Sequence, residues 1–168
     1  MNIGVIKEPA AILQKAKEIG WAPQFIGMTA SVNQSFLNLA GDATEFGKGY
    51  KAFYACYLSD EDLPGPKEYR EAMKKFAPDV KPDEISFHAY GAAKLMCEGL
   101  ERAGKDLTRE GLVKAMETIK DYSNSVNPPC TFGPNYRIGA SAARLVKVSG
   151  GKFVAISDWI YPKFVESK

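Results

Sequence analysis

The residues best suited to covalent or metal chemistry in this chain are three cysteines and one histidine. Cys56, Cys97 and Cys130 lie 41 and 33 residues apart, and His88 is the only histidine. A zinc site needs about four thiolate or imidazole ligands in close spacing. This pattern does not offer them, so we expect no metal site. We interpret the cysteines as small buried apolar groups.

A nucleophilic enzyme would pair Cys130 or a serine with His88 as the base. His88, however, falls in the first turns of a predicted amphipathic helix, and no glycine-framed turn marks a nucleophile. A histidine at the edge of a core is the favoured interpretation. A thiol-based enzyme would also need a depressed thiol pKa at one of the cysteines.

The glycine-rich segment GDATEFGKG at 41–49 resembles a phosphate-binding loop in composition. That motif places four residues between the first glycine and the Gly-Lys pair, followed by Ser or Thr for magnesium. Here five residues intervene, and Gly49 follows Lys48. We therefore expect a flexible surface loop. A nucleotide-dependent enzyme would need phosphate affinity near Lys48.

Five aromatic residues could line a pocket for a small molecule, which needs apolar walls with a few polar groups. The same rings could instead fill the core, and the sequence leaves both interpretations open. The five residues are Phe53, Tyr54, Tyr57, Phe87 and Tyr90.

The composition is that of a globular protein, with 45% hydrophobic and 25% charged residues in a chain of 168. It excludes wholesale disorder, a collagen-like fibre and a disulfide miniprotein. The net charge of +2 makes nucleic acid a poor partner. No run of 18 apolar residues is present, so we expect no membrane span.

The secondary structure that would position the candidate residues starts with a predicted strand at 2–6, a helix at 8–19 and a second strand at 24–28. This order is typical of a parallel α/β unit. A further helix is predicted at 31–39, and an aromatic-rich strand at 52–58.

The middle of the chain is predicted to be helical. One helix follows Pro66, Asp83 caps a long helix that ends at Gly104, and Thr108 caps another. The long helix carries an apolar stripe of Ile85, Ala89, Ala92, Leu95, Met96, Gly99 and Leu100.

The last part of the chain is predicted to be a loop at 124–139 followed by a β-hairpin. Adjacent glycines at its centre allow the positive φ of a tight turn. We divide the chain into three segments, which are residues 1–58, 59–123 and 124–168. The fold class is α/β, with parallel strand–helix–strand units, a central helical segment and a C-terminal β-hairpin.

Three stretches, in this order, resemble the type I periplasmic binding proteins of branched-chain amino acid ABC transporters. They are PAAILQKAKEIGWAPQFIGMTASVNQSFLNLAGDATE, SFHAYGAAKLMCEGLERAG and GKFVAISDW. The resemblance implies that 1–58 is part of a second-lobe unit and that 59–123 normally packs on a first lobe. The chain departs from the family in being about half its length, in lacking the first-lobe sheet and leader, and at FGKGYK (46–51).

The resemblance implies a non-catalytic solute-binding component, or a fragment of one, in a branched-chain amino acid-type ABC transporter. Family members hold a solute in a cleft between two lobes that close by hinge motion. The expected solute is a small amino acid or an aromatic or organic acid, and the expected partner of the full-length parent is an ABC permease. No cofactor is implied.

The same resemblance implies four solute-contacting residues. Thr29 follows the strand whose loop lines the cleft, where amino-acid-binding members can carry an acid for the ligand's ammonium. Its uncharged hydroxyl makes a carboxylate or aromatic solute as plausible as leucine. Tyr90, Phe87 and Lys7 are further candidates, and Lys7 lies near a family position that contacts ligand. Packing or solvent exposure is the alternative for each.

The absent first-lobe sheet would leave the apolar stripes of the middle helices uncovered. We therefore expect a homodimer, with segment exchange as one form of it. The full-length parent is expected in the periplasm, whereas this chain shows no signal peptide and would be cytoplasmic if its start is authentic. The alternatives are a cytosolic ligand-sensing regulator of the same fold and a thiol- or nucleotide-dependent enzyme.

Overall fold

The computed structural model describes residues 4–105 and 107–161. The described residues form two compact units: unit 1 contains residues 4–58 and 143–160, and unit 2 contains residues 59–105 and 107–142. The chain therefore crosses between the units after Leu58 and after Ala142. The segments predicted from the sequence share the boundary after residue 58. They keep 124–168 as one segment, whereas in the structure the boundary between the units falls between residues 142 and 143.

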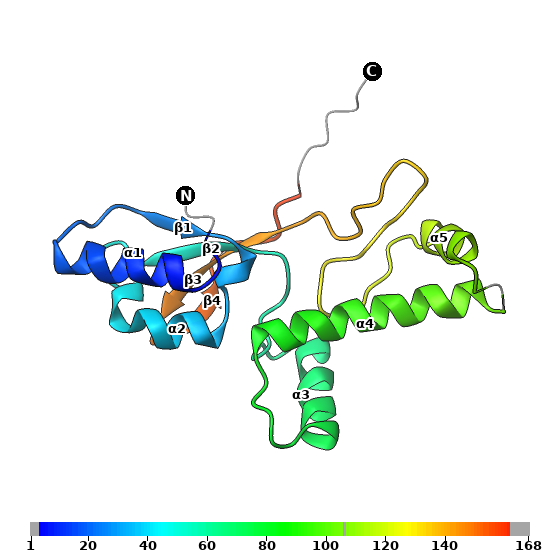
Figure 1. Ribbon diagram of the computed structural model, residues 1–168, viewed down its shortest axis with the longest axis horizontal. Helices are drawn as coiled ribbons and strands as arrows, with labels where there is room; N and C mark the ends of the chain where they lie inside the picture. The colour runs from blue at the N-terminus through cyan, green and yellow to red at the C-terminus, as the bar shows by residue number, and fades with distance from the viewer. Residues whose placement is uncertain (1–3, 106, 162–168) are drawn as a thin grey trace. The chain divides into compact units, whose positions relative to one another are not determined.

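Unit 1 is built on a four-stranded sheet in the order β1-β2-β3-β4 (Figure 1). β1 and β2 are parallel, and the other two pairs are antiparallel. The structure confirms the mixed α/β fold, the parallel strand pair and the C-terminal hairpin. The strands are β1 (Phe25–Gly27), β2 (Tyr50–Tyr54), β3 (Arg144–Ser149) and β4 (Lys152–Ala155).

Two α-helices, α1 (Lys7–Glu18) and α2 (Gln34–Ala40), pack beside each other in unit 1. Phe36 of α2 is fully buried and lies on the sheet, with its ring centroid 4.7 Å from that of Tyr50 and 6.2 Å from that of Phe153. The core of unit 1 therefore sits between α2 and one sheet face. The opposite face carries the alternate residues of β2.

Several predicted elements of unit 1 shift at their ends. The helix predicted at 31–39 is divided into a 3₁₀ turn, η1 (Thr29–Ser31), and α2, because Asn33 caps α2 by accepting a hydrogen bond from the Phe36 N–H at 2.9 Å. The prediction of a flexible loop at 41–49 is wrong for its first residues. Those residues form a second 3₁₀ turn, η2 (Gly41–Thr44), whose last two residues are buried.

The strand predicted at 2–6 can be compared with the structure only in part, because residues 1–3 lie outside the described residues. Residues 4–6 are not in a strand. The strand predicted at 52–58 runs instead from Tyr50 to Tyr54.

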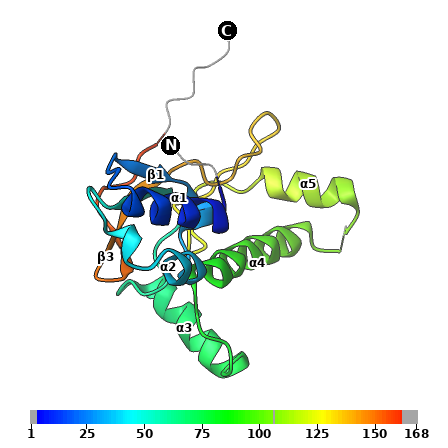
Figure 2. The same cartoon turned by 60° about the vertical axis from the view of Figure 1, so that its left-hand side comes forward.

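Unit 2 is helical, with α3 (Pro64–Phe76), α4 (Glu84–Ala103) and α5 (Arg109–Glu117). Asp83 forms a capping box at the start of α4, as the sequence predicts, and Thr108 caps α5. α4 and α5 run side by side (Figure 2). Their close approach requires Gly99, since a Cβ there would lie 2.3 Å from the Met116 sulfur.

The predicted stripe of α4 is not the face that the structure buries. Gly99 is its one buried residue and Leu95 is half-buried, while the other five are exposed to solvent. The buried face also carries Phe87 and Gly91, which the predicted stripe does not include. The exposed set is Ile85, Ala89, Ala92, Met96 and Leu100.

The residues considered for covalent chemistry are dispersed. All three cysteines are free, and Cys56 and Cys130 are buried. Cys97 is exposed, which corrects its expected burial, because it lies on the uncovered face of α4. His88 is likewise exposed rather than at a core edge. Across residues 4–105 and 107–161, no helix has both the length and the apolarity to cross a bilayer, and no group of three metal-ligating side chains is present.

Candidate functional site

The carboxyl ends of the parallel strands β1 and β2 form the end of unit 1 that bears Thr29. Thr29 opens η1 two residues after β1 ends at Gly27. Its side chain is half-buried, and its hydroxyl donates to the Phe53 carbonyl oxygen at 3.2 Å. Ligands of open α/β sheets bind outside the carboxyl ends of the strands. Thr29 is therefore placed where such a sheet offers a site.

The backbone beneath Thr29 is held by a buried tyrosine. The Tyr50 hydroxyl lies 2.7 Å from the Ser31 hydroxyl, which also donates to the Met28 carbonyl at 2.7 Å. A side chain at Gly27 would collide with this tyrosine, since its Cβ would lie 1.7 Å from the Tyr50 oxygen. Burial raises the pKa of Tyr50 more than the Ser31 hydrogen bond lowers it, so the neutral hydroxyl is retained.

Two more groups lie near this end of unit 1. The connection at 19–24 reverses the chain, so the first turn of α1, with Lys7, lies at the end where β1 finishes (Figure 1). Lys7 is exposed, and the Phe53 ring remains 38% exposed. A hydroxyl, an ammonium and an aromatic ring are thus found at this end of unit 1.

The other two predicted site residues, Phe87 and Tyr90, belong to α4 in unit 2. Phe87 is fully buried, with its ring centroid 4.9 Å from that of Tyr69, so it packs in the core of unit 2. A solute could contact this ring only if the groups that cover it moved. Its predicted role as a solute contact stays a prediction.

Tyr90 belongs to a polar cluster that joins α3 to α4. Its hydroxyl donates to a Glu68 carboxylate oxygen at 2.7 Å, and the Lys94 ammonium lies 2.8 Å from the other oxygen. Loss of hydration and the hydrogen bond to Glu68 raise the pKa of Tyr90 to about 12. Hydrogen bonds from Lys94 and Tyr90 lower the pKa of Glu68. The Tyr90 hydroxyl is therefore already engaged within unit 2.

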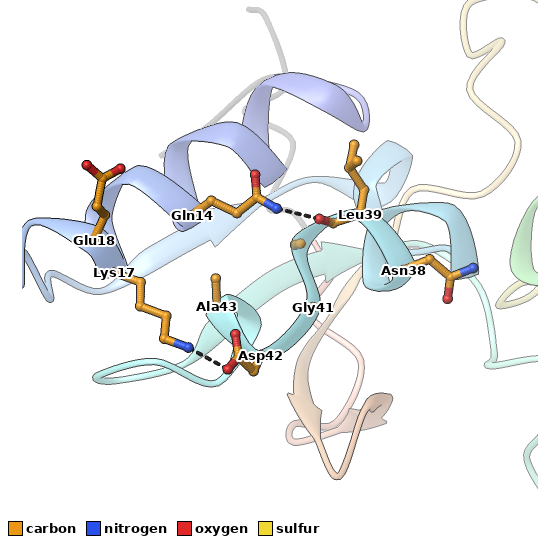
Figure 3. Close-up of a pocket in the computed structure, with 9 residues that line it drawn as sticks. Gln14, Lys17, Glu18, Asn38, Leu39, Gly41, Asp42 and Ala43 are labelled. Carbon is orange, nitrogen blue, oxygen red and sulfur yellow. Dashed lines mark hydrogen bonds and ion pairs between the residues drawn. The ribbon is translucent and has the colours of Figure 1, made fainter.

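Two open hollows in unit 1 contain none of the predicted residues. The first, of about 560 Å³, lies between α1 and residues 38–43 (Figure 3). Its polar groups pair with each other: the Gln14 amide donates to the Leu39 carbonyl at 2.7 Å, and Lys17 lies 2.5 Å from Asp42. The second, of about 500 Å³, lies below the β3–β4 turn. Because these groups are already paired, we interpret the first hollow as the place where α1 packs against residues 38–43 rather than as a solute site.

Comparison with known proteins gives the chain a family context. The family model described as "Periplasmic binding protein" matches residues 1–152. No curated protein has a sequence that matches the chain.

Several solved structures share the fold. A branched-chain amino acid ABC transporter protein from Thermus thermophilus, with bound valine, has a TM-score of 0.79 and 23% identity, covering 95% of this chain and 45% of that one. A possible leucine/isoleucine/valine-binding protein from Rhodopirellula baltica SH 1 has a TM-score of 0.81 and 21% identity, covering 92% and 42%. A fatty acid ABC transporter substrate-binding protein from Thermomonospora curvata has a TM-score of 0.77 and 22% identity, covering 93% and 41%.

This chain spans less than half the length of these three structures. These proteins are described with solutes as different as valine and a fatty acid on one fold, so the fold does not fix the solute.

Proposed function

The chain belongs to the periplasmic binding protein family, and on that premise we propose that it forms part of the solute-binding component of an ABC transporter. The partner of the full-length parent would be an ABC permease, and its location the periplasm. The observation that carries the proposal is the family match over residues 1–152, joined to the exposed groups at the carboxyl ends of β1 and β2.

The chemistry of that end supports an uncharged or acidic solute group beside Thr29. The Thr29 hydroxyl already donates its one proton to the Phe53 carbonyl, so toward a solute it can accept from an amide or a hydroxyl, and it could donate to a carboxylate only by giving up that bond. It offers no charge to offset the ammonium of an amino acid, whereas Lys7 offers a positive charge to an acid. We therefore propose a small organic or aromatic acid, or an amino acid held through its carboxylate.

Binding is proposed here in place of catalysis. Burial raises the pKa of the Cys130 thiol, which reduces its thiolate fraction near neutral pH and opposes a nucleophilic role. The glycine-rich segment begins with a 3₁₀ turn whose Ala43 and Thr44 are buried, which does not suit a phosphate cradle.

The test is a thermal-denaturation screen of the chain against valine, leucine, benzoate and a short-chain fatty acid. A solute at about 100 times its dissociation constant should stabilise the fold by about 2.7 kcal/mol, which raises the melting temperature by several degrees. A cooperative melt that no solute shifts would refute a site within this chain.

A matched pair of variants locates the site. Thr29 and Thr44 both lie in 3₁₀ turns of unit 1, and each hydroxyl donates to a backbone carbonyl, at 3.2 Å for Thr29 and 2.7 Å for Thr44. Thr44 precedes β2, at the opposite end of that strand. We expect Thr29→Val to weaken the solute by roughly fivefold, for one lost hydrogen bond of about 1 kcal/mol. Thr44→Val should leave solute affinity unchanged, and an equal loss in both variants would argue against Thr29.

Self-association is a second part of the proposal. Ile85 and Met96, on the uncovered face of α4, are 54% and 48% exposed, and apolar surface of this kind favours a second copy of the chain as partner. Light scattering at micromolar concentration should give the mass of a dimer, with or without exchanged segments. Met96→Glu should restore the monomer, and a monomeric mass for the unmutated chain would contradict the proposal.

A further inference from the structure

Arg144 is a charged residue buried in unit 1, at the first position of β3. Only 6% of it is exposed. Its guanidinium carbon lies 5.4 Å from the ring centroid of Tyr57 and 4.9 Å from that of Trp159. The two rings meet edge to face, with their centroids 5.3 Å apart. We call these three side chains the Arg144 cluster.

Two members of the Arg144 cluster lie beside the crossings between the units. Tyr57 precedes Leu58, the last residue before the first crossing, and Arg144 is the second residue after the chain returns to unit 1. Trp159 belongs to the segment that follows β4. Three separate segments of unit 1 therefore meet in the Arg144 cluster.

Backbone hydrogen bonds join the second crossing to the segment that follows β4. The Ala143 N–H donates to the Ile160 carbonyl at 3.1 Å, and the Ile160 N–H donates to the Ala143 carbonyl at 2.7 Å. The Leu145 N–H donates to the Ser157 hydroxyl at 2.8 Å. These bonds extend the β3–β4 ladder beyond the end of β4 as far as the second crossing.

The first crossing is reached by a different segment, since β2 ends at Tyr54 and its strand pairing does not extend to Tyr57. The Arg144 guanidinium bridges this gap, because it lies near the ring of Tyr57 as well as that of Trp159. A guanidinium is planar, always charged and weakly hydrated, so it can lie against two rings at once. A lysine ammonium has no flat surface with which to do this.

In unit 2, hydrogen bonds fix Ser59, the first residue after the first crossing. The Ser59 N–H and hydroxyl both donate to the Glu84 carboxylate, the hydroxyl at 2.8 Å, and Arg70 donates to the Ser59 carbonyl. Tyr57 is therefore held by contacts within unit 1 and Ser59 by contacts within unit 2, and Leu58 is the one residue between them.

We propose that Arg144 is a positioning residue that holds both crossings and the segment 156–160 at one place in unit 1. The proposal requires no solute, so its failure would leave the proposed function untouched, and the failure of solute binding would leave the cluster untouched.

Amide hydrogen exchange on Arg144→Met tests this role. We expect about a tenfold loss of protection at the crossings, because stacking of a desolvated cation on two rings has at least that effect on a local equilibrium. The amides to follow are those of Ala143, Leu145, Ile156 and Ile160. Protected amides of β1 and β2 should change by less than about twofold, which a general loss of stability would not produce.

Two variants make the test specific. Arg137→Met removes an exposed guanidinium that pairs with Glu117 at 2.8 Å in unit 2, and it should leave the crossings protected. Arg144→Lys keeps the charge without the flat surface and should give only partial protection. An equal loss in Arg137→Met, or a uniform loss over the whole sheet, would overturn the proposal.

If Arg144→Met does not fold, the unmutated chain still decides the question by nuclear magnetic resonance. The ring currents of Tyr57 and Trp159 should move the side-chain protons of Arg144 upfield. Those of the exposed Arg137 should stay at their ordinary positions. Ordinary shifts for Arg144 would refute the stacked cluster.

Discussion

Unit 1 encloses the rings of Phe36 and Tyr50 between a helix and a sheet, whereas unit 2 leaves one face of its longest helix in water. Phe36 and Tyr50 are at most 1% exposed in unit 1, but Ile85 on α4 is 54% exposed. A helix satisfies its backbone within its own sequence, so α4 can form with one face uncovered. A strand needs a neighbour for the same groups. Unit 1 therefore depends on long-range packing, and unit 2 depends more on local signals.

The largest effect should come from two phenylalanines that differ in burial. Phe36→Ala should lower the free energy of unfolding by about 3–5 kcal/mol, because it empties the space between α2 and the sheet. Phe76→Ala at the end of α3, where the ring is 75% exposed, should change it by less than about 0.5 kcal/mol. Urea denaturation followed by circular dichroism measures both. Similar losses would contradict the contrast between the units.

A smaller difference is expected between two helix caps. Asn33 is fully buried in unit 1 and makes two hydrogen bonds, accepting from the Phe36 N–H and donating to the Ala30 carbonyl, both at 2.9 Å. Asn33→Ala should cost about 2 kcal/mol, since it leaves two buried groups unsatisfied. Asp83→Ala, at the more accessible cap of α4, should cost about 1 kcal/mol. The same denaturation experiment would show the order, and a reversed order would refute it.

The pH dependence of unit 2 should reveal the Tyr90 cluster. The pKa of Tyr90 is raised from 10.0 to about 12 in the folded chain, so its neutral form stabilises the fold. This contribution is complete below pH 10 and is lost as the pH rises to about 12. Tyr90→Phe should therefore make the free energy of unfolding fall less steeply over this range, and Tyr136→Phe serves as the matched control. An unchanged slope in Tyr90→Phe would contradict the prediction.

The smallest effect is expected from surface ion pairs. Lys17 and Asp42 pair in unit 1, and Lys94 pairs with Glu68 in unit 2. Double-mutant cycles should give about 0.2–1 kcal/mol for each pair. The unit 2 pair should be the stronger, because Lys94 and Glu68 are the less exposed. Added salt should weaken both, and a salt-independent coupling would show that packing rather than charge is responsible.

The sequence predicts much of the local structure correctly. Asp83, Thr108 and Gly104 mark the helix ends that the structure shows, because a cap acts within a single turn. The hairpin around its two glycines is also found, since positive φ at adjacent positions specifies the turn. The cap at Asn33 was missed. Its signal, an asparagine three residues before Phe36, is nevertheless present in the sequence.

The candidate site is less predictable from sequence. The resemblance indicates Thr29 and Lys7, but it gives no means of telling that Phe87 is a buried core ring. Nothing in the sequence singles out Arg144 or Trp159. Burial of a charged side chain depends on the rings that surround it, and these come from separate segments of the chain.

The amino-acid sequence by itself determined the helices, the tight hairpin turn and the family to which the chain belongs, because these rest on short-range patterns. The tertiary structure alone decided that the hairpin pairs with β2, with Lys51 opposite Lys147, and that α4 exposes Met96 while burying Phe87. It also decided that Arg144 meets Tyr57 and Trp159 beside the crossings. Such contacts join residues far apart in the chain, and their free energy depends on how all the segments pack together.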